Sequence, residues 1–383
     1  MKKIGVITTG RCDYSIYFPI LKEIKASSSL NLILYVTGMH LFSRYGDSLN
    51  SIKKDGFLKI KKVFADFSSD TPLGVTKAMG EVTNRFGKAF EKEKPDILLV
   101  LGDRFEMHAA ALAAIPFKIP IAHIHGGELT YGSFDEYFRH SLTKLSYFHF
   151  VSTKVYAKRV RQMGEAKERI IVSGAPGLDN ISKIHTQAKE ELEKKFKINF
   201  SKPVLLVTFH PVTSEYGKTK EYIAKLLKAL SLFSDYNIVF TSPNADMGSK
   251  AIRDKIKKFA RRNSNAFYVE NFGRAGYLSM MKNSAAMVGN SSSGIIEAAS
   301  FKLPVVNIGR RQEGRIRGRN VIDTGYEIRE ICAGIRRATS KKFRASLKGI
   351  KNPYGDGKAA KRIVAILKRV KLKAVRPKYF CDL

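Results

Sequence analysis

The chain alternates between short apolar runs and longer stretches in which apolar residues recur every three or four positions. Short apolar runs are typical of strands buried on both faces of a sheet, and the recurring spacing is typical of amphipathic helices. In the first half, the predicted strands are residues 4–8, 30–36, 96–101, 119–125 and 148–152, and the predicted helices are residues 14–25, 76–94, 105–115 and 134–145. This order predicts a parallel, doubly wound α/β sheet.

The alternation breaks near residues 173–202 and then starts again. A Gly-Ala-Pro-Gly segment ends the first half, and a charged helix is predicted over residues 186–196. The later predicted strands are residues 204–209, 237–241, 266–269, 285–288 and 304–307. We therefore expect two Rossmann-like domains, residues 1–180 and 181–383, with a ligand cleft between them. A basic amphipathic helix at about residues 357–370 could pack back on the first domain.

Polar residues gather directly after the predicted strands. In chain order they are Arg11 and Asp13; Asp103, Arg104 and Glu106; His123, His125 and Glu128; Asp135, Glu136, Arg139 and His140; His210; Asn244 and Asp246; and Arg311 with Gln312. Because the carboxyl ends of parallel strands meet at one edge of a sheet, these side chains should lie together. Charged groups are costly to gather at such an edge, so their presence favours a ligand site.

Residues 286–298 have the pattern of a phosphate-binding turn. An apolar run ends at Val288, small residues fill positions 289–294, and a helix is predicted from Ile295. This arrangement presents backbone N–H groups and the positive end of a helix dipole to an anion. Ser291 and Ser292 would add hydroxyl donors, and Glu297 could accept hydrogen bonds from a sugar diol. An ordinary strand-to-helix turn with a serine cap would give the same pattern.

Several of the polar residues also have a purely structural explanation. Asp13 is a plausible N-cap for the helix at 14–25, and Asp103 could cap the helix that follows it. His123 and His125 should share one face of their strand, but no third metal ligand has matching spacing. His140 lies one helical turn from Glu136 and could simply pair with it.

Composition narrows the class of protein. The chain has 383 residues, 44% of them hydrophobic, with 68 Lys and Arg against 34 Asp and Glu. The basic residues are spread along the chain without a dense arm, which favours solvated helix faces over a specific nucleic-acid site. The cysteines, Cys12, Cys332 and Cys381, are few and scattered, so we expect no disulfide framework and a cytoplasmic location. No apolar stretch is long enough for a signal peptide or a membrane span.

The polar motifs occur together in a known order. They are Gly102-Asp-Arg-Phe-Glu106, His123-Ile-His-Gly-Gly-Glu128, Phe134-Asp-Glu136 with Arg139-His140, Phe209-His-Pro211, Pro243-Asn-Ala-Asp246, Gly289-Asn-Ser-Ser-Ser-Gly294 with Glu297, and Arg311-Gln312. In this order the chain resembles the hydrolysing UDP-N-acetylglucosamine 2-epimerases, above all the bacterial enzymes that make N-acetylmannosamine for sialic acid. The resemblance covers roughly residues 2–370 and implies the two-Rossmann-domain glycosyltransferase-B architecture.

The resemblance implies a reaction without cofactor or required metal. UDP is eliminated from UDP-N-acetylglucosamine to give a glycal, and water then adds so that C2 is inverted. By position, the acid/base candidates are Asp103, Glu128 and Asp135; His210 faces the leaving diphosphate; Arg11, Ser291, Ser292 and Arg311 hold phosphates; Glu297 binds the ribose; and Asn244, Arg104, Arg139 and His140 complete the substrate site. Many relatives have Glu where this chain has His125, so His125 and Glu128 both stay candidates for one role.

Other readings stay open at this point. The same chemistry could act on a 2,4-diacetamido UDP sugar of the legionaminic-acid type. A non-hydrolysing epimerase and a glycosyltransferase share the fold. A nucleotide-sugar-binding regulator would need the phosphate loop but not the carboxylates, and a nucleic-acid binder rests on charge alone. We expect a homo-oligomer, a dimer or a tetramer, whose size the sequence does not decide.

Overall fold

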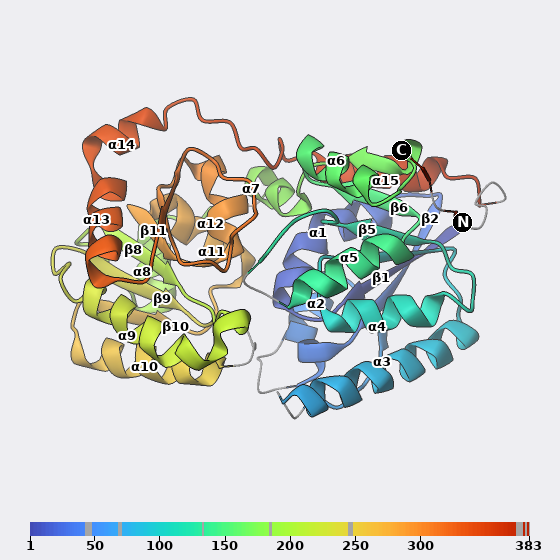
Figure 1. Cartoon of the computed structure of the whole chain (residues 1–383), viewed down its shortest axis with the longest axis horizontal. Helices are drawn as coiled ribbons and strands as arrows, with labels where there is room; N and C mark the ends of the chain where they lie inside the picture. The colour runs from blue at the N-terminus through green and yellow to red at the C-terminus, as the bar shows by residue number, and fades with distance from the viewer. Residues whose placement is uncertain are drawn as a thin grey trace. The chain divides into compact units, whose positions relative to one another are not determined.

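The computed structural model describes residues 1–42, 48–67, 71–131, 134–183, 186–243, 248–372, 378–379 and 381–382. The chain divides into two compact units, each with its own sheet (Figure 1). The first unit comprises Met1–Glu128, Asp135–Asn180 and Tyr354–Leu383, and the second comprises Leu129–Phe134 and Ile181–Pro353.

The first unit is built on seven parallel strands in the order β3-β2-β1-β4-β5-β6-β7. They are β1 (Lys2–Thr8), β2 (Leu30–Val36), β3 (Ile60–Lys62), β4 (Ile97–Leu101), β5 (Ile121–Ile124), β6 (Phe148–Val151) and β7 (Ile170–Val172). The central strand β1 pairs with β2 on one side and β4 on the other, so that Val6 lies between Leu34 and Leu99. The strand order reverses between β1 and β4, which makes this pair the topological switch point.

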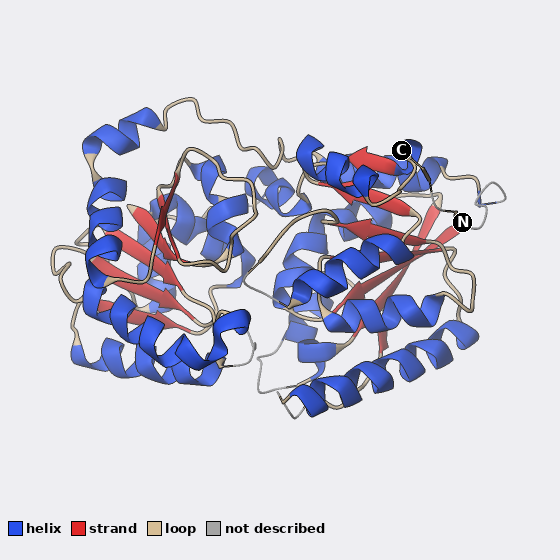
Figure 2. Ribbon diagram, viewed as in Figure 1, coloured by secondary structure: helices blue, strands red, loops and turns tan. Residues whose placement is uncertain are grey.

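Helices cover both faces of this sheet (Figure 2). They are α1 (Arg11–Lys25), α2 (Ser48–Lys54), α3 (Pro72–Lys92), α4 (Phe105–Ala114), α5 (Asp135–Leu145), α6 (Lys154–Gln162) and α15 (Ala359–Arg369). Helices α3, α4 and α5 lie side by side, and α1 packs against α15. The apolar side of α15 is buried in the core of this unit, with Ile363 and Leu367 fully covered. The last helix of the chain therefore completes the unit that the first strand begins.

The second unit has six parallel strands in the order β10-β9-β8-β11-β12-β13. They are β8 (Val204–Thr208), β9 (Asn237–Thr241), β10 (Ala266–Val269), β11 (Ala286–Gly289), β12 (Val305–Ile308) and β13 (Val321–Thr324). Along β8, Leu205 and Val207 enter one apolar cluster while Val204 and Leu206 enter another. Successive strand residues point to opposite faces, so the sheet has a core on each side. Its switch point lies between β8 and β11.

The helices of the second unit follow the same alternation. They are α8 (Lys189–Phe196), α9 (Thr219–Leu230), α10 (Ser249–Arg262), α11 (Gly273–Asn283), α12 (Ser292–Ile296), α13 (Ile328–Thr339) and α14 (Lys341–Ser346), and the short α7 (Asp179–Lys183) precedes them. Helix α9 lies beside both α10 and α13, and α8 lies beside α11. None of the helices in the described ranges is long and apolar enough to cross a membrane.

The expected fold class, two parallel α/β sheets, is confirmed, and every strand expected from the sequence is present. The pattern does not reveal β3, β7 and β13, which are partly exposed edge strands of only three or four residues. Element ends are less well predicted than element types. The charged helix expected over residues 186–196 begins only at Lys189, and the strand expected over 119–125 is shorter.

The prediction that Asp13 caps helix α1 is wrong. The helix begins at Arg11 with Gly10 as its N-cap, so Asp13 lies inside the first turn. Its buried carboxylate accepts hydrogen bonds from the backbone N–H and the hydroxyl of Thr9. An acidic residue at the third helical position that reaches back in this way still satisfies a backbone donor at the helix start.

Helix α15 is capped by a residue distant in sequence. The Asp179 carboxylate accepts hydrogen bonds from the backbone N–H groups of Ala359 at 2.9 Å and Ala360 at 2.8 Å. Asp179 is buried, so these bonds are shielded from competing water. The Asp179 side chain therefore joins the segment Asp135–Asn180 of the first unit to helix α15.

Asp179→Ala should lower the free energy of unfolding by about 2–3 kcal/mol, because it removes two hydrogen bonds to a buried carboxylate and a helix cap. Thermal unfolding followed by circular dichroism measures the loss. Asp356→Ala is the matched control: it removes an exposed partner of Arg362 on the same helix, which should contribute less than about 1 kcal/mol. Equal melting temperatures for the two variants would contradict the capping role.

Candidate active site

The predicted site residues lie at the carboxyl ends of the central strands in each unit. In doubly wound sheets, ligands bind outside these ends, next to the switch point. In the first unit the relevant segments follow β1, β4 and β5, and in the second they follow β8, β11 and β12. The structure places Arg11, Asp103, Arg104, His125, Glu128, Asp135, Arg139 and His140 in the first unit, and His210, Ser291, Ser292, Glu297 and Arg311 in the second. Asn244 and Asp246 lie outside the described residues.

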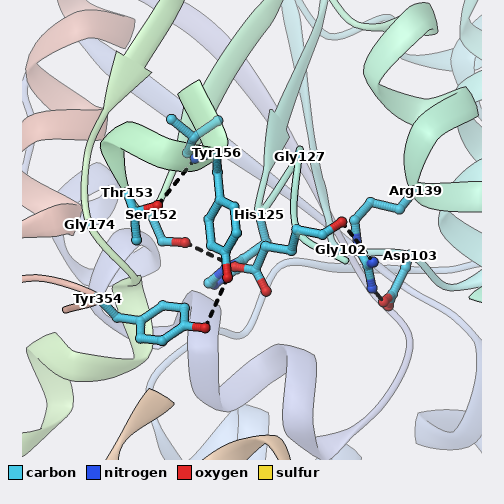
Figure 3. A network of polar contacts seen from close by, with 12 residues as sticks. Gly102, Asp103, His125, Gly127, Arg139, Ser152, Thr153, Tyr156, Gly174 and Tyr354 are labelled. Carbon is cyan, nitrogen blue, oxygen red and sulfur yellow. Dashed lines mark hydrogen bonds and ion pairs between the residues drawn. The ribbon is translucent and has the colours of Figure 1, made fainter. Parts of the chain in front are cut away.

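Arg139 belongs to the polar network of the first unit and lies beside Asp103 (Figure 3). Its side chain is only 1% exposed and projects from α5. The guanidinium donates to the Asp103 carboxylate, to Glu136 at 2.6 Å and to the Glu128 carbonyl at 3.1 Å. One buried cation therefore joins the segments that follow β4 and β5. Asp103 pairs with Arg139, and it does not cap α4, whose N-cap is Arg104.

His125 and Glu128 form a second buried pair in the same unit. The distance from His125 Nδ1 to Glu128 Oε1 is 2.6 Å, and the Ser152 hydroxyl donates to the same oxygen at 2.9 Å. Glu128 is 1% exposed, so its carboxylate is almost fully removed from water. Ser152 follows β6 and was not among the predicted site residues, although polar residues just after a strand were the signal used for the others.

The expectation that His123 and His125 share a strand face is wrong. Strand β5 ends at Ile124, and His125 adopts a left-handed backbone conformation with φ 66°. This conformation interrupts the alternation of side chains that a strand would impose. His123 Nε2 instead contacts the Gly102 carbonyl at 2.8 Å. Burial lowers the pKa of His123 to about 3, so this imidazole is neutral. Among the described residues, no group of three or more His, Cys, Asp and Glu is placed to hold a metal ion.

The glycines between His125 and Glu128 have a steric explanation. Gly127 has φ 75°, and a Cβ there would lie 2.7 Å from the Tyr156 carbonyl oxygen. Arg159 donates to the Gly127 carbonyl. The Tyr156 ring is itself fixed, because its hydroxyl lies 3.0 Å from that of Tyr354 and both rings are buried. Helix α6 therefore packs so closely on the turn that only glycine fits.

The remaining charged residues of the first unit surround this network. Arg104 donates to both oxygens of Glu106, at 3.1 Å and 3.2 Å. Burial raises the pKa of Asp13 above its usual value, and the nearby Arg104 guanidinium opposes this rise. Arg11 begins α1, and Asp135 begins α5.

His140 has the partner that its sequence spacing suggests. Its Nε2 lies 3.0 Å from Glu136, which is the intrahelical pair that the sequence left open.

In the second unit, Asn290 joins the two strands of the switch point. Its side-chain Oδ1 accepts from the His210 backbone N–H at 2.7 Å, and its Nδ2 donates to the His210 carbonyl at 2.9 Å. The Asn290 carbonyl accepts from Arg311 at 3.2 Å and from Gln312 at 2.9 Å. His210 and Arg311, which the resemblance assigns to the diphosphate, are thus held by one buried residue. Asn290 was not predicted as a site residue, although it lies within a quoted motif.

The serine loop differs from the expectation in one respect. Helix α12 begins at Ser292 rather than at Ile295, Ser291 is its N-cap, and Glu297 lies at its C-terminal end. The helix has only five residues, so its dipole is small. Any anion bound here would depend chiefly on hydroxyls and local N–H groups. Gly289 is required at the start of the loop, since its φ is 135° and a Cβ would lie 2.0 Å from the Thr208 carbonyl oxygen.

Tyr277 on α11 is a further polar group at this loop that the sequence did not indicate. The hydroxyls of Ser293 and Thr208 lie beside its phenol. Burial raises the pKa of Tyr277 to about 12, so the phenol keeps its proton near neutral pH. The tyrosine lies within a helical pattern that shows no sign of a site, which explains why it was missed.

The chain is similar to known proteins over most of its length. A family model described as UDP-N-acetylglucosamine 2-epimerase matches residues 22–368. A Legionella pneumophila protein named UDP-N,N'-diacetylbacillosamine 2-epimerase (hydrolyzing) is 38% identical over 97% of each chain. The Escherichia coli polysialic acid biosynthesis protein P7 is 37% identical over 96% of this chain and 94% of that protein.

Solved structures share the fold. The structure of UDP-GlcNAc 2-epimerase from Neisseria meningitidis bound to UDP-GlcNAc matches with a TM-score of 0.82, at 22% identity over 96% of this chain and 99% of that chain. A Staphylococcus aureus structure in complex with UDP gives the same TM-score and identity over 96% of each chain. Two parallel α/β units of this kind are therefore the architecture of known 2-epimerase structures.

The imidazole of His123 should stay neutral from pH 8 to pH 5, because burial holds its pKa near 3. In the unfolded chain, the His123 imidazole takes up a proton as the pH falls below about 6.5. The folded protein does not, so the contribution of His123 to stability decreases over that range. Histidine resonances in the folded protein, measured by NMR against the urea-unfolded chain, check this. A His123 midpoint near that of the unfolded chain would contradict it.

Proposed function

Because the chain belongs to the UDP-N-acetylglucosamine 2-epimerase family, we propose that it is a hydrolysing 2-epimerase that converts UDP-N-acetylglucosamine and water to UDP and N-acetylmannosamine. The observation that carries the proposal is the buried polar network after β4 and β5, in which Asp103 meets Arg139 and His125 meets Glu128. A protein that only bound the nucleotide would not need acids, a cation and an imidazole held together at the switch point.

The proposed reaction has two steps. In an anti elimination, a base removes the C2 proton, the electron pair forms a C1–C2 double bond, and the C1–O bond to UDP breaks. Water then adds to C1 of the glycal, and a proton returns to C2 on the opposite side. The C2 proton is weakly acidic, so its removal needs a base that is close and desolvated. Asp103, Asp135 and the His125–Glu128 pair are the candidates.

The geometry of the pair suggests how it divides the work. A carboxylate can only accept hydrogen bonds, so Nδ1 of His125 carries the proton in the bond to Glu128. Nε2 then holds the lone pair of the neutral ring and can take up a proton. Glu128, itself held by Ser152, would orient the imidazole and stabilise its protonated form. A carboxylate does the same for histidine in catalytic triads. In this proposal His125 exchanges the proton, and Glu128 positions the His125 imidazole.

The leaving diphosphate requires positive charge and hydrogen-bond donors. In our proposal Arg11, His210 and Arg311 supply charge, and Ser291 and Ser292 supply hydroxyl and N–H donors. Glu297 would accept from the ribose hydroxyls. Asn244, Arg104 and His140 would contact the rest of the substrate. We also expect a homo-oligomer, a dimer or a tetramer, whose size light scattering on the purified protein would measure. The few scattered cysteines favour a cytoplasmic location.

A second substrate has specific support. Two of the similar proteins are named as hydrolysing 2-epimerases of a diacetamido sugar. The Legionella pneumophila protein is named for UDP-N,N'-diacetylbacillosamine, and the Campylobacter jejuni protein for GDP/UDP-N,N'-diacetylbacillosamine. The chemistry at C1 and C2 is the same for both sugars, so the polar network described above serves either one. The two sugars differ at C4 and C6, where N-acetylglucosamine has hydroxyl groups and the other sugar has an acetamido group and a methyl group.

Incubation with each UDP sugar in D₂O should decide both substrate and mechanism. Elimination followed by hydration places one deuterium at C2 of the released 2-acetamido sugar, which proton NMR detects. The preferred substrate should show the higher kcat/KM. Product without deuterium at C2 would rule out the glycal, and no turnover of either sugar would reject the proposed function.

His125→Ala should lower kcat by about 10²–10⁴-fold, as expected for loss of a general acid/base, while UDP binding changes little. Ser152→Ala should have a much smaller effect, because it removes only one of the contacts that hold Glu128. His125→Glu, which restores the carboxylate that many relatives have, should recover more activity than His125→Gln. If Glu128→Gln lowered kcat far more than His125→Ala, the assignment of the two roles would be reversed.

A further inference from the structure

A pair of stacked tyrosines shares one carboxylate in the second unit. The rings of Tyr222, on α9, and Tyr326, just after β13, are parallel within 2° with centroids 3.6 Å apart. Both hydroxyls contact Oε2 of Glu215, at 3.1 Å for Tyr222 and 3.3 Å for Tyr326. Glu215 follows β8 and the predicted catalytic residue His210. Neither tyrosine nor Glu215 belongs to the site described above.

The direction of each hydrogen bond follows from the chemistry of the groups. The backbone N–H of Arg310 donates to the Tyr326 hydroxyl oxygen at 3.3 Å. That hydroxyl therefore accepts from Arg310 and directs its own proton to Glu215, since a carboxylate has no proton to give. Burial, with Glu215 as a further cause, raises the pKa of Tyr222 to about 12, so its hydroxyl also remains a donor.

The Tyr326 ring also fills the space beside Gly309. Gly309 has φ 71°, and a Cβ there would lie 2.0 Å from the ring carbon that bears the hydroxyl. The ring thus packs directly on the backbone where β12 ends and the segment 309–312 begins. Tyr326 contacts this segment twice, once by packing on Gly309 and once through the amide of Arg310.

The segment 309–312 carries the groups that reach the switch point. Arg311 and Gln312 both donate to the carbonyl of Asn290, whose side chain pairs with the main chain of His210. Contacts therefore run from Glu215 through Tyr326 to the segment, and from the segment through Asn290 to His210. The two ends of this series lie only five positions apart in sequence, so the contacts close on themselves around the carboxyl ends of β8, β11 and β12.

We propose that Glu215 and Tyr326 are positioning residues, which fix the segment 309–312 so that the Arg311 guanidinium is held ready for the diphosphate of the substrate. This inference rests on the proposed function, because it takes Arg311 as a phosphate-binding group. Without the carboxylate, the Tyr326 hydroxyl loses the acceptor that fixes its rotation, and its bond to the Arg310 amide weakens. Holding a charged donor in place before binding lowers the cost of ordering it when the ligand arrives.

A role in stability alone is the competing explanation, and the tyrosine pair offers a matched control. Tyr326→Phe removes the hydroxyl that bonds both Glu215 and Arg310 while the stacked ring stays. Tyr222→Phe removes the hydroxyl of the other stacked ring, which bonds the same carboxylate oxygen, whereas in the described part of the chain the Arg310 amide bonds Tyr326. If the network served only stability, the two variants should behave alike.

The experiment measures UDP affinity by calorimetry and amide hydrogen exchange across residues 309–313 in the full-length protein. Tyr326→Phe should raise the Kd for UDP by about 5–10-fold, because a charge-assisted hydrogen bond is weakened by loss of positioning, while Tyr222→Phe should change it by less than about two-fold. Exchange at the Arg310 amide should be faster in Tyr326→Phe only. In an Arg311→Ala background, Tyr326→Phe should have little further effect on Kd, since both changes act through one group.

The outcomes separate this inference from the proposed function. If Arg311→Ala weakens UDP binding but Tyr326→Phe and Glu215→Gln do not, the positioning role is overturned and the phosphate role of Arg311 stands. Equal Kd changes in Tyr326→Phe and Tyr222→Phe would also overturn it in favour of a general structural role. Failure of the wild-type protein to bind UDP would instead reject the proposed function, and the positioning of a phosphate-binding group would fall with it.

Discussion

A single buried guanidinium constrains the first unit's candidate site. Removing a cation from water costs several kcal/mol unless acceptors replace the lost hydration. Arg139, at 1% exposure, obtains these acceptors from Asp103 after β4, from Glu136 on its own helix and from the carbonyl of Glu128 after β5. The charge balance thus dictates that two strand ends and one helix meet at one point. Of the acids proposed for catalysis, Asp103 is held by this cation through its carboxylate and Glu128 through its backbone carbonyl.

The second unit reaches a similar result with an uncharged group. The Asn290 side chain accepts one hydrogen bond through Oδ1 and donates one through Nδ2, and so pairs with both main-chain groups of His210. An amide can be buried at low cost when all its hydrogen bonds are made. The Asn290 carbonyl in turn accepts hydrogen bonds from Arg311 and Gln312, so this neutral residue contacts a cationic side chain without a charge of its own. The first unit therefore gathers acids around a cation, while the second places Arg311 and the main chain of His210 around one neutral residue, Asn290.

The parts of this protein that depend on a local sequence pattern could be predicted from the sequence. Strands buried on both faces are continuous apolar runs, so β1, β2, β4 and β9 were predictable, as was the collection of polar residues at their ends. Pairings were not predictable. Asp103 and Arg139 are 36 residues apart, and the tie between Glu215 and Tyr326 spans 111 residues, so only the packed fold brings them together. Backbone conformation was equally hidden, since nothing in the sequence marks His125 as left-handed.

The left-handed backbone at His125 bears on the chemistry. With φ 66°, the residue leaves strand geometry and its ring reaches the carboxylate only three positions further on. A non-glycine residue pays for this conformation in strain, which tight surroundings must offset. Two contacts offset this strain, namely the 2.6 Å contact with Glu128 and the packing of the Gly127 turn on Tyr156.

A lone glutamate at this position would bring its own charge and need no partner. An imidazole needs a neighbour that sets its tautomer, and Glu128, held in turn by Ser152, is placed to do so. With histidine at this position, where the resemblance implies a carboxylate in many family members, the proposed chemistry is retained because a buried acid accompanies the imidazole.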